Sequence, residues 1–160
     1  MLRYILYLIL ITLVPAIELR GSIPYGMLVN RQLHWLWVVV ICTVANIAIG
    51  FVVYFLIEYV IKAMTHLGPV HRWWTRYVER TQKKIHASVE KYGEWGLAIF
   101  IGVPLPGTGA YTGALAAYLL GMSFKKFAVA NILGVVIAGV IVTVVCLTGS
   151  TAFSIFVKKL

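Results

Sequence analysis

The chain has 160 residues, of which 61% are hydrophobic and only 12% are charged, and its mean hydropathy is +0.92. A soluble domain of this length could not bury so much apolar surface, so the composition excludes an ordinary soluble fold and predicts a single integral membrane domain over residues 1–160. The net charge of +9 does not indicate nucleic-acid binding, because the basic residues lie between and beside apolar stretches, a pattern typical of contact with anionic lipid headgroups.

The first apolar stretch runs from Tyr4 to Val14 and resumes weakly from Tyr25 to Val29. Between these two parts lies a break whose residues interrupt regular helix or carry charge: Pro15, Glu18, Arg20, Gly21 and Pro24. The start of the chain resembles a signal peptide, with one basic residue before an apolar run, but no small-x-small cleavage pattern follows it. We therefore expect this segment to be retained.

Two stretches are intact and uncharged, Leu33 to Ile57 and Phe127 to Leu147. Each has about 20 residues or more, which is long enough for a helix to cross about 30 Å of hydrocarbon. Because a backbone inside lipid must satisfy its own hydrogen bonds, these stretches predict two transmembrane helices and an all-α fold.

A third apolar stretch, Trp95 to Met122, is interrupted in its middle by Pro104, Pro106, Gly107 and Gly109. Each arm beside a break has only about 10 to 13 residues, too few to cross a bilayer alone. Each broken stretch therefore has two interpretations. It is either a re-entrant hairpin that enters and leaves the membrane on one side, or one long kinked span.

The distribution of charge favours re-entrant hairpins. In that arrangement one side of the membrane carries these basic residues: Lys62, Arg72, Arg76, Arg80, Lys83, Lys84, Lys91, Lys125 and Lys126. The other side carries Arg3, Arg20, Arg31, Lys158 and Lys159. The positive-inside rule then places the basic linker 62–91 in the cytoplasm of a prokaryotic cell, with the protein in its plasma membrane.

The two halves of the chain resemble each other, since each has a broken stretch followed by an intact one. The segment 44–47 (Val-Ala-Asn-Ile) recurs as 129–132, 85 positions later, and Gly21 corresponds to Gly107, 86 positions later. Halves separated by one crossing insert with opposite orientation, so the sequence predicts an inverted repeat with a substrate site between discontinuous helices near the midplane. The two halves are residues 1–60 and 94–160, joined by the linker 61–93.

The linker is basic and amphipathic. Pro69 is suited to begin a helix and Gly93 to end it, and like charges follow one side at four-residue spacing: Arg72, Arg76, Arg80 and Lys84. Lipid phosphates would relieve the repulsion within that row, so we predict a helix on the inner leaflet, with Trp73 and Trp74 at headgroup depth. The alternative is a soluble loop helix.

Glu18 is the candidate proton-binding residue. Lipid disfavours the charged form of a carboxylate, so Glu18 at membrane depth is expected to bind and release a proton as its access changes. The guanidinium of Arg20 would oppose protonation, or would hold an anionic headgroup with its planar fork. The alternative is an ion pair between Glu18 and Arg20 at the membrane interface.

The second break contains prolines, which lack a backbone donor, and glycines, which allow close approach. A half-helix that starts near Gly109 would direct its N–H groups to the midplane, where they suit a phosphate or a carboxylate. We therefore predict proton or substrate binding at these residues of the two breaks: Glu18, Arg20, Pro24, Pro104, Pro106, Gly107, Thr108, Gly109 and Thr112. The alternative is a tight hairpin tip that only allows helices to pack.

The intact spans contain polar and small residues that we expect to pack helices together rather than contact substrate: Asn46, Gly50, Asn131 and Gly134. The two cysteines and four histidines have no spacing typical of a metal site. No arrangement of nucleophile and base suggests catalysis. We therefore expect no metal, no cofactor and no enzymatic activity.

The motifs Pro-Ala-Ile-Glu-Leu-Arg-Gly-Ser-Ile-Pro at 15–24 and Pro-Leu-Pro-Gly-Thr-Gly-Ala-Tyr-Thr-Gly at 104–113 together resemble those of the small multidrug export protein family. That family is similar in architecture to the DedA/VTT superfamily, whose members have paired re-entrant loops. The resemblance implies a transporter fold. By analogy it also implies movement of lipid or polyprenyl phosphates driven by a proton gradient, although fold does not settle substrate.

The leading hypothesis is a proton-linked transporter whose partners are membrane lipids and anionic headgroups and whose substrate is a small molecule or a lipid phosphate. One rival is a cationic-drug exporter, in which Glu18 would hold the positive charge of the drug. Another is a non-transporting membrane scaffold, which would need no polar cavity. Since about four membrane elements are few to enclose a pathway, we expect a homodimer.

Overall fold

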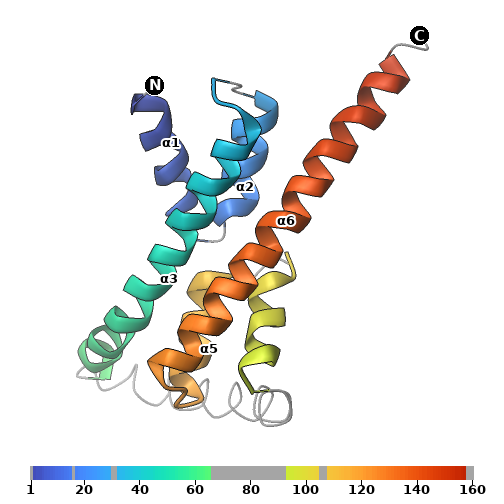
Figure 1. The fold of residues 1–160 in the computed structure, drawn as a ribbon. Coiled ribbons are helices and arrows are strands. Elements are labelled where there is room, and N and C mark those ends of the chain that lie inside the picture. Colours follow the sequence, from blue (N-terminus) through green and yellow to red (C-terminus); the bar gives the residue numbers. More distant parts are fainter. Residues whose placement is uncertain (1, 16, 30–31, 66–92, 105–107, 158–160) are drawn as a thin grey trace.

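The computed structural model describes residues 2–15, 17–29, 32–65, 93–104 and 108–157 (Figure 1). The regular elements in these ranges are all helices, which confirms the predicted all-α class. Most of the predicted linker helix, together with Pro106 and Gly107 of the second break, lies outside the described residues.

Two helices are long and apolar enough to cross a membrane. Helix α3 spans Trp35–Thr65, with its apolar part at Trp35–Ile57, and α6 spans Phe124–Val157, with its apolar part at Phe124–Gly149. In the most apolar 18-residue part of each helix, only 22% of α3 and 39% of α6 is buried. Most of their apolar side chains therefore face outward instead of filling a soluble core. Both helices continue past the apolar stretches seen in the sequence.

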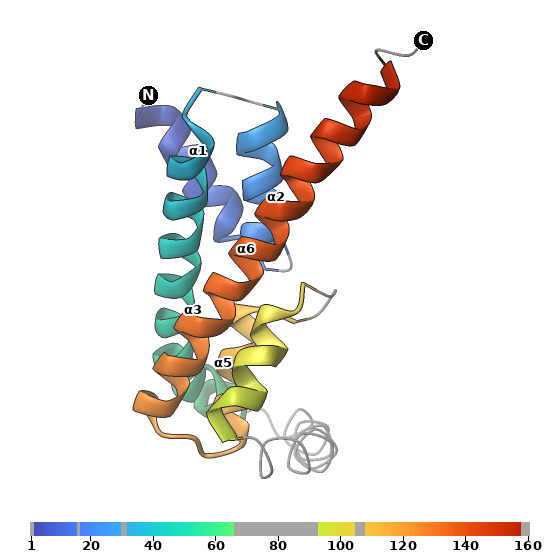
Figure 2. The same ribbon diagram turned by 45° about the vertical axis from the view of Figure 1, so that its right-hand side comes forward.

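Each broken stretch folds as a pair of short helical segments. Helix α1, Leu2–Thr12, is followed by α2, Glu18–Pro24, and by the π-helical turn η1, Tyr25–Val29. The helical segment 93–102 is followed by α5, Ala110–Leu119. In Figures 1 and 2 the two pairs lie toward opposite ends of the long helices, and their turns approach each other at mid-height.

The first break is shorter than the sequence predicts. Helix α2 already begins at Glu18, so Gly21 and Pro24, which we expected in the break, lie inside a helix. A Cβ on Gly21 would lie only 2.3 Å from Cγ2 of Ile17, so glycine fits this turn closely. Pro24 is the last residue of α2, where its ring and missing N–H end the α-helical hydrogen bonding and the wider π-helical turn begins.

The core lies where the two short pairs pack against α3 and α6. Helix α3 contacts α1, α2, α5 and α6. The largest fully buried apolar side chains come from α1, α2, α3, the helical segment 93–102 and α6: Leu8, Leu19, Ile23, Val38, Leu97, Ile101, Phe127 and Val135. Near the end of α3 the ring of Tyr54 stacks on Phe127, with centroids 4.6 Å apart, and its hydroxyl donates to the carbonyl of Met122. This contact ties α3 to the start of α6.

Glycines on the two long helices allow close approaches between helices. A Cβ on Gly134 of α6 would lie 2.6 Å from Cβ of Ile101 and 2.7 Å from the carbonyl oxygen of Ala98. A Cβ on Gly50 of α3 would lie 2.6 Å from Nδ2 of Asn131. Because real Cβ atoms do not approach other atoms this closely, a larger residue at either position would force the helices apart.

Replacing Gly134 tests this packing. We expect Gly134→Ala to lower the free energy of unfolding by about 1–3 kcal/mol, since the added methyl group meets backbone that cannot move locally. The matched control is Gly149→Ala in the same helix, where an added Cβ meets nothing within 4 Å. That control should be neutral or slightly stabilising, because alanine favours helix over glycine. Equal unfolding free energies for the two variants in detergent would contradict the packing described here.

Candidate functional site

Glu18 is a buried carboxylate at the first residue of α2. Its side chain is 3% exposed, and its φ is 48°, in the left-handed region that residues with a Cβ rarely adopt. This conformation costs about 1–2 kcal/mol for an L-residue other than glycine. The contacts of the Glu18 side chain must therefore offset that strain.

The carboxylate is bound by donors from the other half of the chain and from α3. The backbone N–H groups of Ala110 and Tyr111, the first two residues of α5, donate to its Oε2 and Oε1 over 3.3 and 3.4 Å. Nδ2 of Asn46 donates to Oε2 over 3.3 Å. A carboxylate is favoured here because the first N–H groups of a helix lack intrahelical partners and carry partial positive charge.

Gly109 makes this contact possible. Its φ is 134°, and a Cβ at this position would lie 2.3 Å from Oε2 of Glu18 and 2.6 Å from Oε1. A larger residue at this position would therefore displace the carboxylate as well as strain the backbone. Gly109, near which a half-helix was predicted to start, is therefore the residue against which the Glu18 carboxylate packs.

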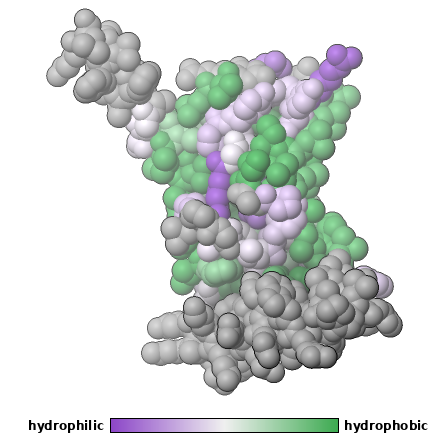
Figure 3. Space-filling model, turned by 180° about the vertical axis from the view of Figure 1, so that it is seen from behind, coloured by the Kyte–Doolittle hydropathy of each residue, from purple (hydrophilic) through white to green (hydrophobic). Residues whose placement is uncertain are grey.

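Arg20 connects the two breaks a second time. Its guanidinium donates to Oγ1 of Thr108 over 2.7 Å and to the carbonyl of Val103 over 3.4 Å, and the Thr108 hydroxyl donates to the same carbonyl over 2.7 Å. Figure 3 shows a hydrophilic strip at mid-height of one face, between apolar areas. Glu18 and Arg20 therefore bind different partners across the two breaks, although they are close enough to interact electrostatically.

Tyr111 makes a third connection between the breaks. Its backbone N–H binds Glu18, and its hydroxyl donates to the carbonyl of Leu13, at the end of the first arm. Beside them the hydroxyl of Thr12 donates to that of Ser22 over 2.7 Å, and Ser22 donates to the carbonyl of Glu18 over 3.2 Å. Each irregular backbone segment thus finds hydrogen-bond partners in the other, as a water-poor environment requires.

The remaining predicted site residues lie apart from the carboxylate or at its edge. Thr112 donates to the carbonyl of Gly109 within the first turn of α5. Pro104 lies half-buried in the turn before it. Pro24 lies at the opposite end of α2 from Glu18.

Of the four residues predicted to pack helices, Asn46 instead contacts the carboxylate. Asn131 donates through Nδ2 to the carbonyl of Ile47 over 3.1 Å and lies against Gly50, while Gly134 lies against the helical segment 93–102. Tyr111 was not among the residues predicted to bind a proton or a substrate. The sequence signal that could have identified Tyr111 is its position directly after the glycine-rich break, where its N–H group lies at the start of a helix.

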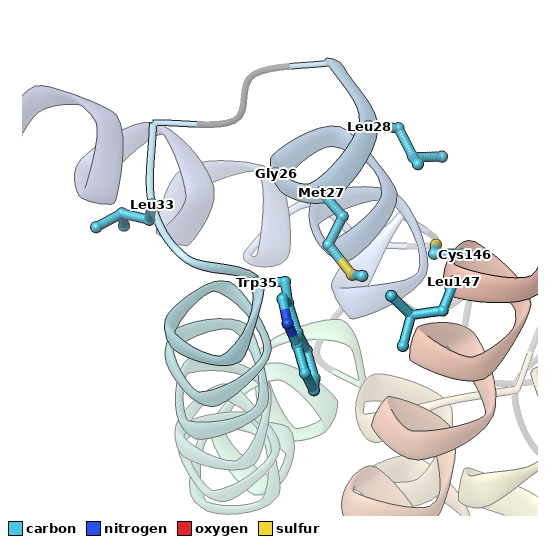
Figure 4. Close-up of a pocket in the computed structure, with 7 residues that line it drawn as sticks. All are labelled: Gly26, Met27, Leu28, Leu33, Trp35, Cys146 and Leu147. Atoms are coloured by element: carbon cyan, nitrogen blue, oxygen red, sulfur yellow. The ribbon is translucent and has the colours of Figure 1, made fainter. Parts of the chain in front are cut away.

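An apolar cavity of about 240 Å³ lies at another place, between η1, the start of α3 and the later part of α6 (Figure 4). The described residues that line it are uncharged: Gly26, Met27, Leu28, Leu33, Trp35, Cys146 and Leu147. A second cavity, of about 370 Å³, lies beside Glu94 and Lys126. The first suits a hydrocarbon group, because most of the described side chains that line it are apolar.

The described residues hold no cluster of three His, Cys, Asp or Glu side chains able to bind a metal ion. Cys42 and Cys146 are both buried and are not joined in a disulfide.

A family model described as "Putative small multi-drug export protein" matches residues 18–141. The match begins at Glu18 and therefore includes the carboxylate, its partners in α3 and α5, and most of α6. No curated protein and no solved structure matches this chain.

Gly109→Ala tests whether Gly109 holds the carboxylate in place. We expect it to lower the free energy of unfolding by about 2–4 kcal/mol, from backbone strain plus overlap with Glu18. Gly121→Ala is the matched control, since Gly121 also has positive φ, 63°, but an added Cβ would meet nothing within 4 Å. That variant should lose only the backbone part, about 1 kcal/mol. Combining Gly109→Ala with Glu18→Ala should be non-additive, and strict additivity would exclude a direct contact.

Proposed function

The chain belongs to the small multi-drug export family, and on that premise we propose that it is a proton-linked membrane exporter in which Glu18 binds the proton. The observation that carries the proposal is the buried Glu18 carboxylate at the N-terminus of α5. Intramembrane carboxylates are costly and commonly belong to proton or substrate pathways. The family description names export, and this carboxylate supplies a site at which export could be coupled to protons.

In this proposal the two broken stretches are re-entrant hairpins of an inverted repeat. Their short segments support this, because 11 residues in α1 and 10 in α5 are too few to cross about 30 Å of hydrocarbon. The turns of the two hairpins would then meet near the midplane, where inverted-repeat transporters place their sites. The basic linker 62–91 would face the cytoplasm of a prokaryotic cell.

Protonation of Glu18 would act on the connection between the hairpins. A charged carboxylate receives hydrogen bonds that contribute about 1.5–3 kcal/mol each, compared with about 1 kcal/mol for a neutral acceptor. Three donors reach Glu18, from Asn46, Ala110 and Tyr111. Two of these donors belong to α5, so neutralising Glu18 would weaken the contact between α2 and α5 by at least about 1 kcal/mol, which favours separation of the hairpins at least about fivefold.

The substrate in this proposal is an amphiphile with an anionic group, such as a lipid phosphate. Arg20 and the donors at the start of α5 favour negative charge, and the apolar cavity beside Trp35 suits a hydrocarbon tail. A cationic drug fits less well, because the groups that reach Glu18 all donate hydrogen bonds to it. We propose that the protein has no enzymatic activity.

The decisive variant is Glu18→Gln, which keeps the size of the side chain but cannot titrate. Wild-type protein in liposomes should move substrate faster when a proton gradient is imposed, and its rate should depend on pH. In Glu18→Gln we expect at least a tenfold loss of gradient-driven transport and no remaining pH dependence. The control is Glu94→Gln, at the cavity near Lys126, which should behave like wild type. A Glu18→Gln variant with the wild-type pH profile would remove this mechanism.

Membrane topology can be tested with single cysteines in a Cys42→Ala, Cys146→Ala background. If the second broken stretch is re-entrant, Glu94→Cys and Ser123→Cys should react with an impermeant maleimide from the same side, and His34→Cys from the other. If that stretch is a full span, Ser123→Cys should react from the side of His34→Cys. This second outcome would contradict the re-entrant arrangement but would leave the role of Glu18 to the transport measurement.

A further inference from the structure

The start of α5 is an anion cradle that the chain fills with its own carboxylate. Two consecutive N–H groups, of Ala110 and Tyr111, reach the two oxygens of Glu18 separately, and Gly109 leaves the space that the anion occupies. This geometry suits any group with two or three anionic oxygens, including phosphate, sulfonate and carboxylate. While Glu18 is charged and in place, a second anion cannot use these donors.

Glu18 is held in the cradle against strain. Its φ of 48° is unfavourable for glutamate. The hydrogen bonds to the carboxylate therefore stabilise a backbone conformation that would change to a more favourable φ without them. If those bonds weaken, the strain favours departure of the side chain from Gly109. The residue is therefore suited to two positions rather than one.

Asn46 offers a partner for the protonated form of Glu18. Its side chain is 1% exposed, its Nδ2 donates to Glu18, and its buried Oδ1 has no hydrogen-bond partner. A buried carbonyl oxygen without a partner is unfavourable by about 1–3 kcal/mol. A protonated carboxyl group carries an O–H that needs an acceptor, and rotation of the Asn46 amide would present Oδ1 to it.

The other titratable groups around Glu18 keep a constant charge near neutral pH. Arg20 on the same helix and Tyr111 on α5 interact electrostatically with it. The described buried titratable groups of the other packed helices are Tyr4 of α1, Cys42 of α3 and Cys146 of α6, which are neutral at neutral pH. Among the described residues that interact electrostatically with Glu18, Arg20 is permanently charged, and its guanidinium also favours an incoming anion.

We infer that the start of α5 is an exchange site, where one proton taken from bulk water by Glu18 admits one anionic group of the substrate. The protonated Glu18 leaves the N–H groups of Ala110 and Tyr111 and donates to Oδ1 of Asn46. The substrate anion takes its place on those N–H groups, beside Arg20. This inference rests on Glu18 as the proton site of the proposed function, and it adds that proton and anion bind together because the deprotonated carboxylate competes for the same donors.

The test is calorimetric binding of hexanesulfonate to the full chain in an uncharged detergent. The charge of this probe does not change with pH, so proton uptake reports only on the protein. Repeating the titration at several pH values in buffers of different ionisation enthalpy should show about one proton taken up per anion bound wherever affinity falls about tenfold per pH unit. Inorganic sulfate and hexyltrimethylammonium are the comparison ligands.

Two variants separate exchange from ordinary anion binding. Glu18→Gln should bind hexanesulfonate without proton uptake and with affinity independent of pH. Asn46→Leu, which keeps the branched shape, should weaken the proton-linked binding about tenfold, whereas Asn131→Leu, at a buried amide that contacts Ile47 instead, should not. Sulfate binding as strongly as hexanesulfonate would assign the site to a free anion, and weaker sulfate binding to an amphiphile headgroup.

Anion binding by wild-type protein without proton uptake at any pH would overturn the exchange site, and so would preferential binding of hexyltrimethylammonium. Because this measurement involves no membrane, it does not depend on transport. Proton-linked binding in a protein that moves nothing in liposomes would reject the exporter and retain the exchange site. The wild-type titration alone decides the inference if a variant does not fold.

Discussion

One hydrogen-bonded contact, between the Glu18 carboxylate and the first N–H groups of α5, joins the two breaks of the chain. A helix that begins inside a bilayer has donors that water cannot satisfy, and a carboxylate there has a charge that water cannot solvate. The N–H donors and the carboxylate are each unfavourable in lipid without a partner, and the hydrogen bonds between them satisfy both. The positive φ of Glu18 and the small size of Gly109 are consequences of that pairing.

The rest of the packing supports this contact. Arg20 with Thr108, and Tyr111 with Leu13, join the same two turns, so the irregular backbone of each break is satisfied by the other. Glycines on the long helices allow close approach without large side chains between them, as in Gly134 against Ala98. Apolar side chains outside this centre face outward along α3 and α6, which is stable only in lipid.

Two buried amides occupy related positions in the two halves but have different surroundings. Asn46 of α3 contacts the carboxylate, whereas Asn131 of α6 contacts the backbone of α3. A repeated sequence motif therefore does not yield a repeated contact. The asymmetry arises because the first half supplies the acid and the second half supplies the helix start that binds it, so one composite site replaces two equivalent ones.

The sequence by itself determined the helical class, the two long apolar helices and the two breaks, because lipid restricts which residues can lie at membrane depth and how long a helix must be. It also identified Glu18, Arg20, Thr108 and Gly109 as chemically unusual for their surroundings. It extended the first break too far, since Gly21 and Pro24 are helical, and it did not pair Asn46 with Glu18 or predict Tyr111 as a site residue. Only the tertiary structure decided those pairings, because Glu18 and α5 lie about 90 positions apart and a hydrogen bond depends on distance in space, which spacing along the chain does not specify.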